Sequence, residues 1–589
     1  MLLAPSPVVL PSFTRSRFSP PTPPPHITHR KGGGPQNAAM SRGLNYNQAA
    51  GLQGMLKEGS KSMEGVDEAV IRNIEAAKQL ARICSSSMGP NGLKKLVVNH
   101  LEKIIVTSDC ATILKELEVQ HPAAKMLVLA AMMQEKECGD ATNLTVSFAG
   151  ELLKKAEDLL HTGLHTSEIV AGYRIAFEKA MEILPTLTVH TVDDPRDAAQ
   201  VSQVLESVLG TKYFGYQATL APYVTQACQA VMPPAPKKPS LNVDSVRVCK
   251  LQGGTIGDSL VMKGIVVSRN TEGTIKRAVK AKVAVYGCGI EASSTETKGT
   301  VLIRNAEDLL NYNKGEEKLM EDIIKGIAES GVAVVVTGGS ISEMALHFLE
   351  RYKLMVVKIQ SKWELRRLCG AVNATALVRL GPPTAEEAGF VDVAEVREVG
   401  GRKITVFEQD AEESRVASII LRASTHNVLE DLERAVDDGV NTVKVLCTDG
   451  RFLPGAGAVE IELARRIYKL ADASTGLDQY AMRKFAEALE IVPRTLAESS
   501  GQDATDTVAA LYAEHEKGNS SAGVHVEGTG VKVVGGEGGQ GVFDSLFVKD
   551  SALRLAVDAA LTVLRVDQII MSKPAGGPKP PAGGGGDED

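Results

Sequence analysis

The sequence predicts a multi-domain protein that combines α domains with one α/β domain. The chain has 589 residues, which exceeds what a single hydrophobic core usually supports, so two or more domains are expected. Helix-period patterns occupy both ends of the region expected to fold, whereas the middle carries short runs rich in β-branched residues. An α/β insert inside a helical domain is the simplest arrangement, with two crossing segments forming a hinge between them.

The composition is that of an ordinary globular protein and excludes several function classes. Hydrophobic residues make up 43% and charged residues 23% of the chain. The net charge of -7 leaves no basic footprint for nucleic acid. No apolar run reaches the roughly 18 residues of a spanning helix, so we expect no membrane association. The eight cysteines form no CxxC pair, which favours free, buried thiols in a reducing compartment over zinc or disulfides.

Both ends of the chain are expected to be disordered. Residues 1–53 lack Asp and Glu and contain the run "SPPTPPP", a composition that cannot fold alone. It partly resembles an organelle transit peptide, but Met40 is a plausible native start, which favours a tail or an over-extended reading frame for residues 1–39. Residues 574–589 are of low complexity.

The elements are predicted in order from apolar spacing. Residues 66–84, 122–137, 144–160 and 166–184 carry apolar side chains three or four apart, which predicts helices. Short β-rich runs follow from about residue 243, among them "KGIVVS", "KVAVYG", "VAVVVTGG" and "LMVVKI". Helical patterns return at residues 429–446, 458–470, 477–492 and 551–566.

Two loops in the first helical part carry candidate chemistry. In "SSSMGPNGLKKLVV", Gly89, Pro90 and Gly92 are expected to end a helix before a strand. Glycines there let backbone N–H groups approach an anion, although the same residues suit an ordinary turn. In "VTSDCATILKEL", Asp109 precedes a short helix and is expected to cap it.

The third loop, "CGDATN", joins two predicted helices. Gly139 is expected to end the helix that Pro122 begins, and the next helix opens just after Asp140. A helix N-terminus offers unpaired N–H groups and a positive dipole end to phosphate, and a carboxylate beside it can hold Mg²⁺. On local grounds alone, a plain helix–helix turn is the alternative.

The order of five motifs along the chain resembles the group II chaperonins, the ATP-driven protein-folding rings of archaea and the eukaryotic cytosol. The motifs are "MGPNGLKKLVV", "VTSDCATILKEL", "CGDATN", "LPGAGAVEIELARR" and "VLRVDQIIMSKP". The resemblance runs from about residue 54 to 581. Three longer stretches, such as "HLEKIIVTSDCATILKELEVQHPAAKM", are similar to one particular subunit of the eukaryotic complex.

This resemblance implies the chaperonin architecture of three domains. A helical equatorial domain would comprise residues 54–188 and 449–573, and a hinge-like intermediate domain residues 189–246 and 406–448. An α/β apical, substrate-binding domain would comprise residues 247–405, with a helical protrusion at about 297–318 that acts as a built-in lid. The helix in "SISEMALHFLERYK" would lie near client proteins, but most of its apolar side chains are expected to be core, so no client-binding residue is assigned.

The resemblance also implies a site for ATP or ADP with Mg²⁺. Asp140 would be the metal ligand, and two carboxylates, Asp109 and Asp438, would orient the attacking water. Asp438 would arrive from the intermediate domain on closure; without the resemblance, it is a solvated acid on a helix. The remaining nucleotide-binding residues would be Met88, Gly89, Ala141, Thr142, Asn143, Leu144, Leu209, Gly210, Lys212, Gly455, Ala456, Gly457 and Asp544, of which Leu209, Gly210 and Lys212 match a loop that senses the γ-phosphate.

The sequence departs from the family pattern at four positions. Ala141 and Ala456 stand where the family usually has Gly, Asn143 where it has Thr, and Asn91 where it often has Lys. A Cβ at position 141 or 456 costs about 1 kcal/mol or more if the backbone there is left-handed. We therefore expect nucleotide binding, with a strained and slower site if φ of Ala141 is positive.

The implied function is that of a subunit in a cytosolic double ring of paralogous chaperonin subunits, which encloses and folds non-native proteins. Two alternatives remain open. One is a structural subunit of such a ring that binds nucleotide with weak or no hydrolysis. The other is a free-standing small-molecule kinase, which would need an acid or base of its own near the γ-phosphate.

Overall fold

The computed structural model describes residues 61–64, 69–291, 306–409, 416–535 and 541–571. The predicted N-terminal extension, the C-terminal tail and residues 297–305 of the predicted protrusion lie outside these residues, whereas residues 306–318 belong to helix α8 (Ala306–Glu329). In the described part, no helix is both long enough and apolar enough to cross a membrane.

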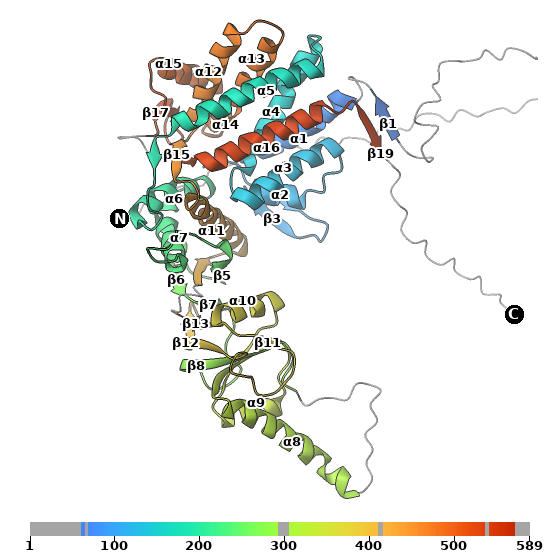
Figure 1. Cartoon of the computed structure of the whole chain (residues 1–589), viewed down its shortest axis with the longest axis vertical. Helices are drawn as coiled ribbons and strands as arrows, with labels where there is room; N and C mark the ends of the chain where they lie inside the picture. The colour runs from blue at the N-terminus through green and yellow to red at the C-terminus, as the bar shows by residue number, and fades with distance from the viewer. Residues whose placement is uncertain (1–60, 65–68, 292–305, 410–415, 536–540, 572–589) are drawn as a thin grey trace, which may run out of the picture. The chain divides into compact units, whose positions relative to one another are not determined.

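Helices from both ends of the chain share the largest apolar core (Figure 1). Near the aromatic ring of Phe485 lie Phe148 and Tyr173, at centroid distances of 5.6 and 5.8 Å. The predicted joining of the chain's two ends in one helical unit is thus confirmed. The helices are α1 (Ile71–Ser85), α2 (Cys110–Glu116), α3 (Pro122–Cys138), α4 (Thr142–His161), α5 (Thr166–Ile183), α12 (Ala458–Ala473), α13 (Asp478–Leu489), α14 (Ile491–Ser499), α15 (Ala504–Glu516) and α16 (Leu546–Leu564), with a short 3-10 turn at Leu184–Leu187.

Four small sheets border this helical part. The first pairs the two ends of the described chain, β1 (Lys61–Glu64) with β19 (Gln568–Met571). The second is the hairpin of β2 (Lys95–Val98) and β3 (Ile104–Thr107). The third places β15 (Arg451–Pro454) between β18 (Phe543–Ser545) and β4 (His190–Thr191), and the fourth pairs β16 (Ala522–Val524) with β17 (Val531–Val533).

A second core lies where the chain crosses between the helical and the α/β parts. It packs α6 (Ala198–Lys212), α7 (Gln217–Val231) and α11 (His426–Leu446) on a three-stranded sheet in the order β5 (Val246–Gln252), β14 (Ala417–Ala423), β6 (Leu260–Lys263). Short 3-10 turns lie at Val243–Ser245 and Ile256–Asp258. Strands β5 and β14 pair in parallel along their whole length, so the two chain crossings share one sheet. The domain limits of the sequence analysis stay a prediction.

The α/β part is built on a seven-stranded sheet. Its order is β10 (Met355–Lys358), β9 (Val332–Thr337), β8 (Arg277–Tyr286), β12 (Gly389–Val399), β13 (Arg402–Glu408) and β7 (Ile265–Val267), and β11 (Ala376–Leu377) also pairs with β8. Separate apolar cores lie on its two faces. In its described residues, this part carries the helices α8 (Ala306–Glu329), α9 (Glu343–Arg351) and α10 (Lys362–Val372).

Helix α9 carries the apolar residues considered for client contact. Ala345, Phe348 and Leu349 are buried, whereas Met344 is exposed. The expectation that most of these side chains belong to the core is therefore confirmed for Phe348 and Leu349, and nothing here assigns a client contact.

Candidate functional site

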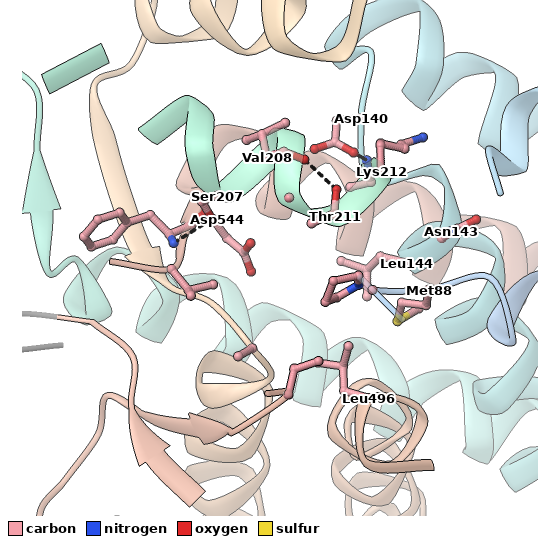
Figure 2. A pocket seen from close by; sticks show the side chains of 18 of the residues that line it. Met88, Asp140, Asn143, Leu144, Ser207, Val208, Thr211, Lys212, Leu496 and Asp544 are labelled. Carbon is pink, nitrogen blue, oxygen red and sulfur yellow. Dashed lines mark hydrogen bonds between the residues drawn. The ribbon is translucent and has the colours of Figure 1, made fainter. Parts of the chain in front are cut away.

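A cavity of about 530 Å³ lies where the helical part meets the second core. Its walls come from the loop after α1, the α3–α4 junction, the end of α6, the start of α12 and the β18–α16 junction. Figure 2 shows Asp140 and Lys212 along one side of the cavity, with Asp544 well apart from Met88 and Leu144. Elements separated by hundreds of residues thus form one site.

The first turn of α4 presents backbone donors to this cavity. The helix follows Ala141, whose φ of 63° and ψ of 21° are left-handed and whose methyl side chain cannot cap a helix. The first backbone donor of α4 with a helical partner is Thr145, which donates to the Ala141 carbonyl at 3.1 Å. Among the described residues, the N–H groups of Thr142, Asn143 and Leu144 therefore have no protein acceptor.

The start of α12 has a similar geometry. Ala456 has φ 52° and Gly457 φ 81°, and Gly457 gives α12 no side-chain cap. Both family departures at glycine positions, Ala141 and Ala456, thus occupy left-handed backbone, where an L-residue costs about 1–2 kcal/mol. The left-handed backbone that would strain the site is therefore present at both Ala141 and Ala456.

Asp140 lies between the end of α3 and the first turn of α4. Gly139 ends α3 in a left-handed conformation with φ 73°, as its sequence position predicted. The Asp140 carboxylate accepts a hydrogen bond from the Ala141 N–H at 2.6 Å. Burial raises the pKa of Asp140, and the Lys212 ammonium opposes this rise. Because burial makes the ionised form of this carboxylate costly, a cation bound beside it would stabilise that form.

Lys212 holds the two predicted catalytic carboxylates together. Its Nζ lies 2.8 Å from Asp109 Oδ1 and 3.0 Å from Asp438 Oδ2. The other carboxylate oxygen of Asp109 accepts from the N–H and the hydroxyl of Thr112, which confirms its predicted capping of α2. Burial opposes the ionisation of Asp109, but Lys212 and Thr112 outweigh it and lower its pKa to about 2.

Asp438 is buried on α11, which contradicts the reading of this residue as a solvated acid. Its Oδ2 atom lies near the Lys212 ammonium but has no hydrogen-bond donor in suitable geometry among the described residues. Burial raises the pKa of Asp438 well above its usual value, Lys212 opposes the rise, and Asp140 and Asp109 add to it. Asp438 therefore binds a proton more readily than an ordinary Asp side chain, whereas Asp109 beside it stays ionised.

A fourth carboxylate, Glu135 on α3, is electrostatically coupled to this group. Burial raises the pKa of Glu135 to about 7, the charge of Asp109 adds to the rise, and Lys212 opposes it. The single Lys212 cation thus serves several neighbouring acids, and its own pKa is raised well above the usual value, because the charges of Asp438 and Asp109 outweigh its burial.

A buried lysine organises the opposite side of the cavity. Lys549 Nζ lies 2.7 Å from Glu460 Oε1 and 2.6 Å from Asp544 Oδ2. Burial disfavours the charge of Lys549, but the two carboxylates outweigh this and raise its pKa. The second oxygen of Glu460 is buried with no partner among the described residues.

Most predicted site residues line the cavity, and four do not. The lining set comprises Met88, Gly89, Asp140, Ala141, Thr142, Asn143, Leu144, Gly210, Lys212, Ala456, Gly457 and Asp544. The other four are Asp109, Asp438, Leu209 and Gly455. Asp109 and Asp438 form ion pairs with Lys212, which does line the cavity. Leu209 is fully buried in the second core. The expectation of a sensing loop at residues 209–212 is corrected, because these residues form the end of helix α6.

Several residues of the site were not predicted from the sequence. Glu460 and Lys549 form the buried pair just described, and Ser207 pins α6 to β18 by exchanging two hydrogen bonds with the Phe543 backbone at 2.9 and 3.0 Å. The apolar wall was missed as well: Val492, Leu496, Val524, Val526 and Val534. The available signal for Lys549 was a lysine five residues after Asp544, just before the helix predicted at residues 551–566.

The site suits a magnesium nucleotide on four grounds. Unpaired N–H groups at the positive end of α4 are donors for phosphate oxygens, and Asp140 beside them is an oxygen ligand of the kind Mg²⁺ prefers. The valine- and leucine-rich wall offers an apolar surface to a base. Asn143 Oδ1 and Glu460 Oε2 are buried polar atoms without a protein partner among the described residues, as expected where a ligand completes the hydrogen bonding.

Comparison with known proteins gives a consistent result. The TCP-1/cpn60 chaperonin family matches residues 80–574. T-complex protein 1 subunit theta of Dictyostelium discoideum is 50% identical over 539 residues, which cover 92% of this chain and 99% of the relative. The proteins of the same name from Homo sapiens and Arabidopsis thaliana are each 50% identical over 92% of this chain, covering 98% and 99% of their own length. The chain therefore belongs to the TCP-1/cpn60 chaperonin family.

Proposed function

We propose that this chain is a subunit of an ATP-dependent cytosolic chaperonin ring of the TRiC/CCT type, in which it binds and hydrolyses ATP to drive the folding of enclosed, non-native proteins. The relatives that cover nearly its whole length are named as subunits of T-complex protein 1. Its partners would be paralogous subunits of a double-ring hetero-oligomer and non-native clients.

The observation that carries the proposal is the convergence of three carboxylates and one lysine beside a helix with free N–H groups. The N–H groups of Thr142, Asn143 and Leu144 would bind phosphate oxygens, and Asp140 would hold the metal. When bound, Mg²⁺ would compensate the charge of the transferring phosphoryl group.

The two buried acids would then divide the work on the attacking water. Asp438 would take the proton, because its raised pKa suits a general base. Asp109 would stay ionised and orient the water, because Lys212 and Thr112 hold its pKa at about 2. Since Asp438 lies on α11 in the second core and Asp109 on the helical core, movement between these cores would gate hydrolysis.

The experiment compares binding with hydrolysis on assembled rings that carry this chain. Asp438→Ala should retain ATP affinity but lose the hydrolysis contributed by this subunit, whereas Asp140→Ala should weaken Mg-dependent binding itself. Unchanged ring ATPase activity and client folding with both Asp109→Ala and Asp438→Ala would count against a catalytic role.

A second candidate function is a subunit that binds nucleotide in the same ring and hydrolyses it weakly or not at all. The left-handed Ala141 and Ala456 favour it, because both place a strained backbone beside the phosphate and adenosine walls. Single-turnover hydrolysis separates the two functions, since a subunit that only binds nucleotide would release ATP unchanged.

A free-standing kinase, by contrast, should elute near the mass of a monomer or dimer rather than as a ring of megadalton size.

A further inference from the structure

A second cavity, of about 490 Å³, lies in the α/β part and shares no lining residue with the first. Three parallel strands end beside it in register: Tyr286 of β8 pairs with Thr337 of β9, and Thr337 pairs with Lys358 of β10. The next residues, Gly287, Gly338 and Ile359, all line the cavity. It therefore opens at the carboxyl ends of the parallel strands in this mixed sheet, a place where α/β proteins commonly bind ligands.

One wall of this cavity is a face of α10. Lys362 and Arg366 lie one turn apart on this helix, and both line the cavity. Among the described residues, neither cation has a carboxylate within ion-pair distance, and no Asp or Glu lines the cavity. Two exposed cations thus flank the opening without an internal counter-charge.

The interior of the cavity is apolar. Its floor is made by Leu365 and Ile359, which are 6% and 1% exposed, and Cys369 lies one turn along α10 from Leu365. Glycines at the two strand ends keep the space open, because a Cβ on Gly338 would lie only 3.2 Å from the Leu365 side chain. The site joins an apolar recess to a positively charged rim.

We propose that this recess binds an organic anion, with a carboxylate or phosphate between Lys362 and Arg366 and an attached apolar group against Leu365 and Ile359. The anion could come from a free small molecule or from the carboxyl terminus of a peptide chain that ends in an apolar residue. The shared chemistry is one negative charge beside one apolar group. The proposal does not depend on the nucleotide site.

The test is isothermal titration of the full-length chain with three probes: inorganic phosphate, phenyl phosphate, and a short peptide ending in Leu as its free acid or its amide. Phenyl phosphate should bind more tightly than inorganic phosphate, because only the former fills the recess. Binding of the peptide acid but not the amide would place the anion on a peptide chain, and binding of phenyl phosphate alone would place it on a small molecule. The chain's only tryptophan, Trp363, is 69% exposed beside Lys362, so its emission reports the location independently.

Charge reversal supplies the specificity control. Lys362→Glu with Arg366→Glu should weaken binding of whichever probe binds by about tenfold or more. Arg367→Glu reverses one charge on the same helix, but Arg367 does not line the cavity, so affinity should change by less than about twofold. All three positions are exposed, so the variants should fold.

Three results would overturn the proposal. The first is the absence of heat and of Trp363 emission change with every probe up to about 1 mM, the weak limit of specific binding. The second is an equal loss of affinity in the Arg367 variant, which would show that the loss comes from the overall charge of the helix and not from a contact in the cavity. The third is that phenyl phosphate binds no more tightly than inorganic phosphate to the wild type. If phenyl phosphate does bind more tightly, Thr375→Phe at the cavity wall should remove the difference in affinity.

Discussion

At the scale of single residues, Ala141 stands out because it adopts a backbone conformation that usually belongs to glycine. Its φ of 63° brings the first turn of α4 to the cavity, so the strain is located where the phosphate would bind. An L-residue in this region costs about 1–2 kcal/mol, whereas a glycine would cost about 0.5–1 kcal/mol through the extra freedom of the unfolded chain. Strain therefore outweighs entropy at this position.

Ala141→Gly should raise the free energy of unfolding by up to about 1 kcal/mol, the difference between these two terms. Urea unfolding of the full-length chain measures it. The matched control is Ala171→Gly on the exposed side of α5, which should lower the free energy of unfolding by about 1 kcal/mol because the residue is in an ordinary helix. Destabilisation of similar size in both variants would show that Ala141 is unstrained.

Glu135 gives the pH dependence that belongs to this site. Its pKa is about 7 in the folded chain, raised from 4.5 chiefly by burial. Between these two values the folded state holds a proton that the unfolded state has lost, so this residue makes stability fall as pH rises from about 4.5 to about 7.

Glu135→Gln should abolish that loss. The variant should be more stable than the wild type at pH 8, by on the order of 1 kcal/mol because the group is partly solvated, and equally stable at pH 4. Chemical unfolding at the two pH values checks this, with Glu137→Gln on the exposed face of α3 as the control. A Glu135 variant whose advantage is the same at both pH values would contradict the assigned pKa.

At the scale of elements, the α3–α4 junction is fixed against α11 by a glycine. Gly139 has φ 73°, and a Cβ there would overlap the side chain of Asn441. Gly163, after α4, has a φ of 95° but nothing within 4 Å of a Cβ. An added Cβ would therefore cause backbone strain at both positions but steric overlap only at Gly139.

Gly139→Ala should destabilise the chain by about 2–5 kcal/mol, since about 1–2 kcal/mol of strain adds to an overpacking cost of about 1–3 kcal/mol. Gly163→Ala should show the strain alone. Adding Asn441→Ala to the Gly139 variant should restore part of the loss, as denaturant midpoints would reveal. Equal losses in the two glycine variants, with no rescue, would mean that α11 does not press on this junction.

Helices with strong local signals were predictable, and the contacts between elements were not. Pro122 at the first turn and Gly139 after the last one marked both ends of α3, because these residues act through their own backbone. The end of α6 was expected to be a loop because Leu209, Gly210 and Lys212 match a loop of the family, yet Gly210 lies inside the helix. The Lys212–Asp109 contact joins residues 103 positions apart, and no local pattern encodes such a distance.

At the scale of the whole molecule, each apolar core is assembled from segments that are distant in sequence. The largest core joins residues before 188 with residues after 452, and the second core lies on the two chain crossings between it and the α/β part. Composition shifts along the sequence predicted this nesting, because helical and strand periods differ. The domains could be predicted from the family resemblance. The second cavity could not, because its lining comes from strand ends and one helix face, and no sequence motif marks them.

The two ends of the described chain meet in the β1–β19 sheet, which has only these two strands in the described residues. A two-stranded sheet is marginal in water, and each strand leaves one edge of backbone donors and acceptors unpaired. If the proposed ring forms, a neighbouring subunit is the natural cover for these edges. Amide exchange in residues 61–64 and 568–571 should therefore be fast in the isolated chain and slow in the assembled ring.

Hydrogen–deuterium exchange with mass spectrometry on both forms tests this expectation. Strand β15 is the internal control, because it lies between β18 and β4 with Phe452 and Leu453 buried, so it should exchange slowly in both forms. Equal protection of β1 and β19 in the isolated chain and the ring would show that the pair is stable by itself and takes no part in assembly. Slow exchange that appears only in the ring would tie the joining of the chain ends directly to subunit contact.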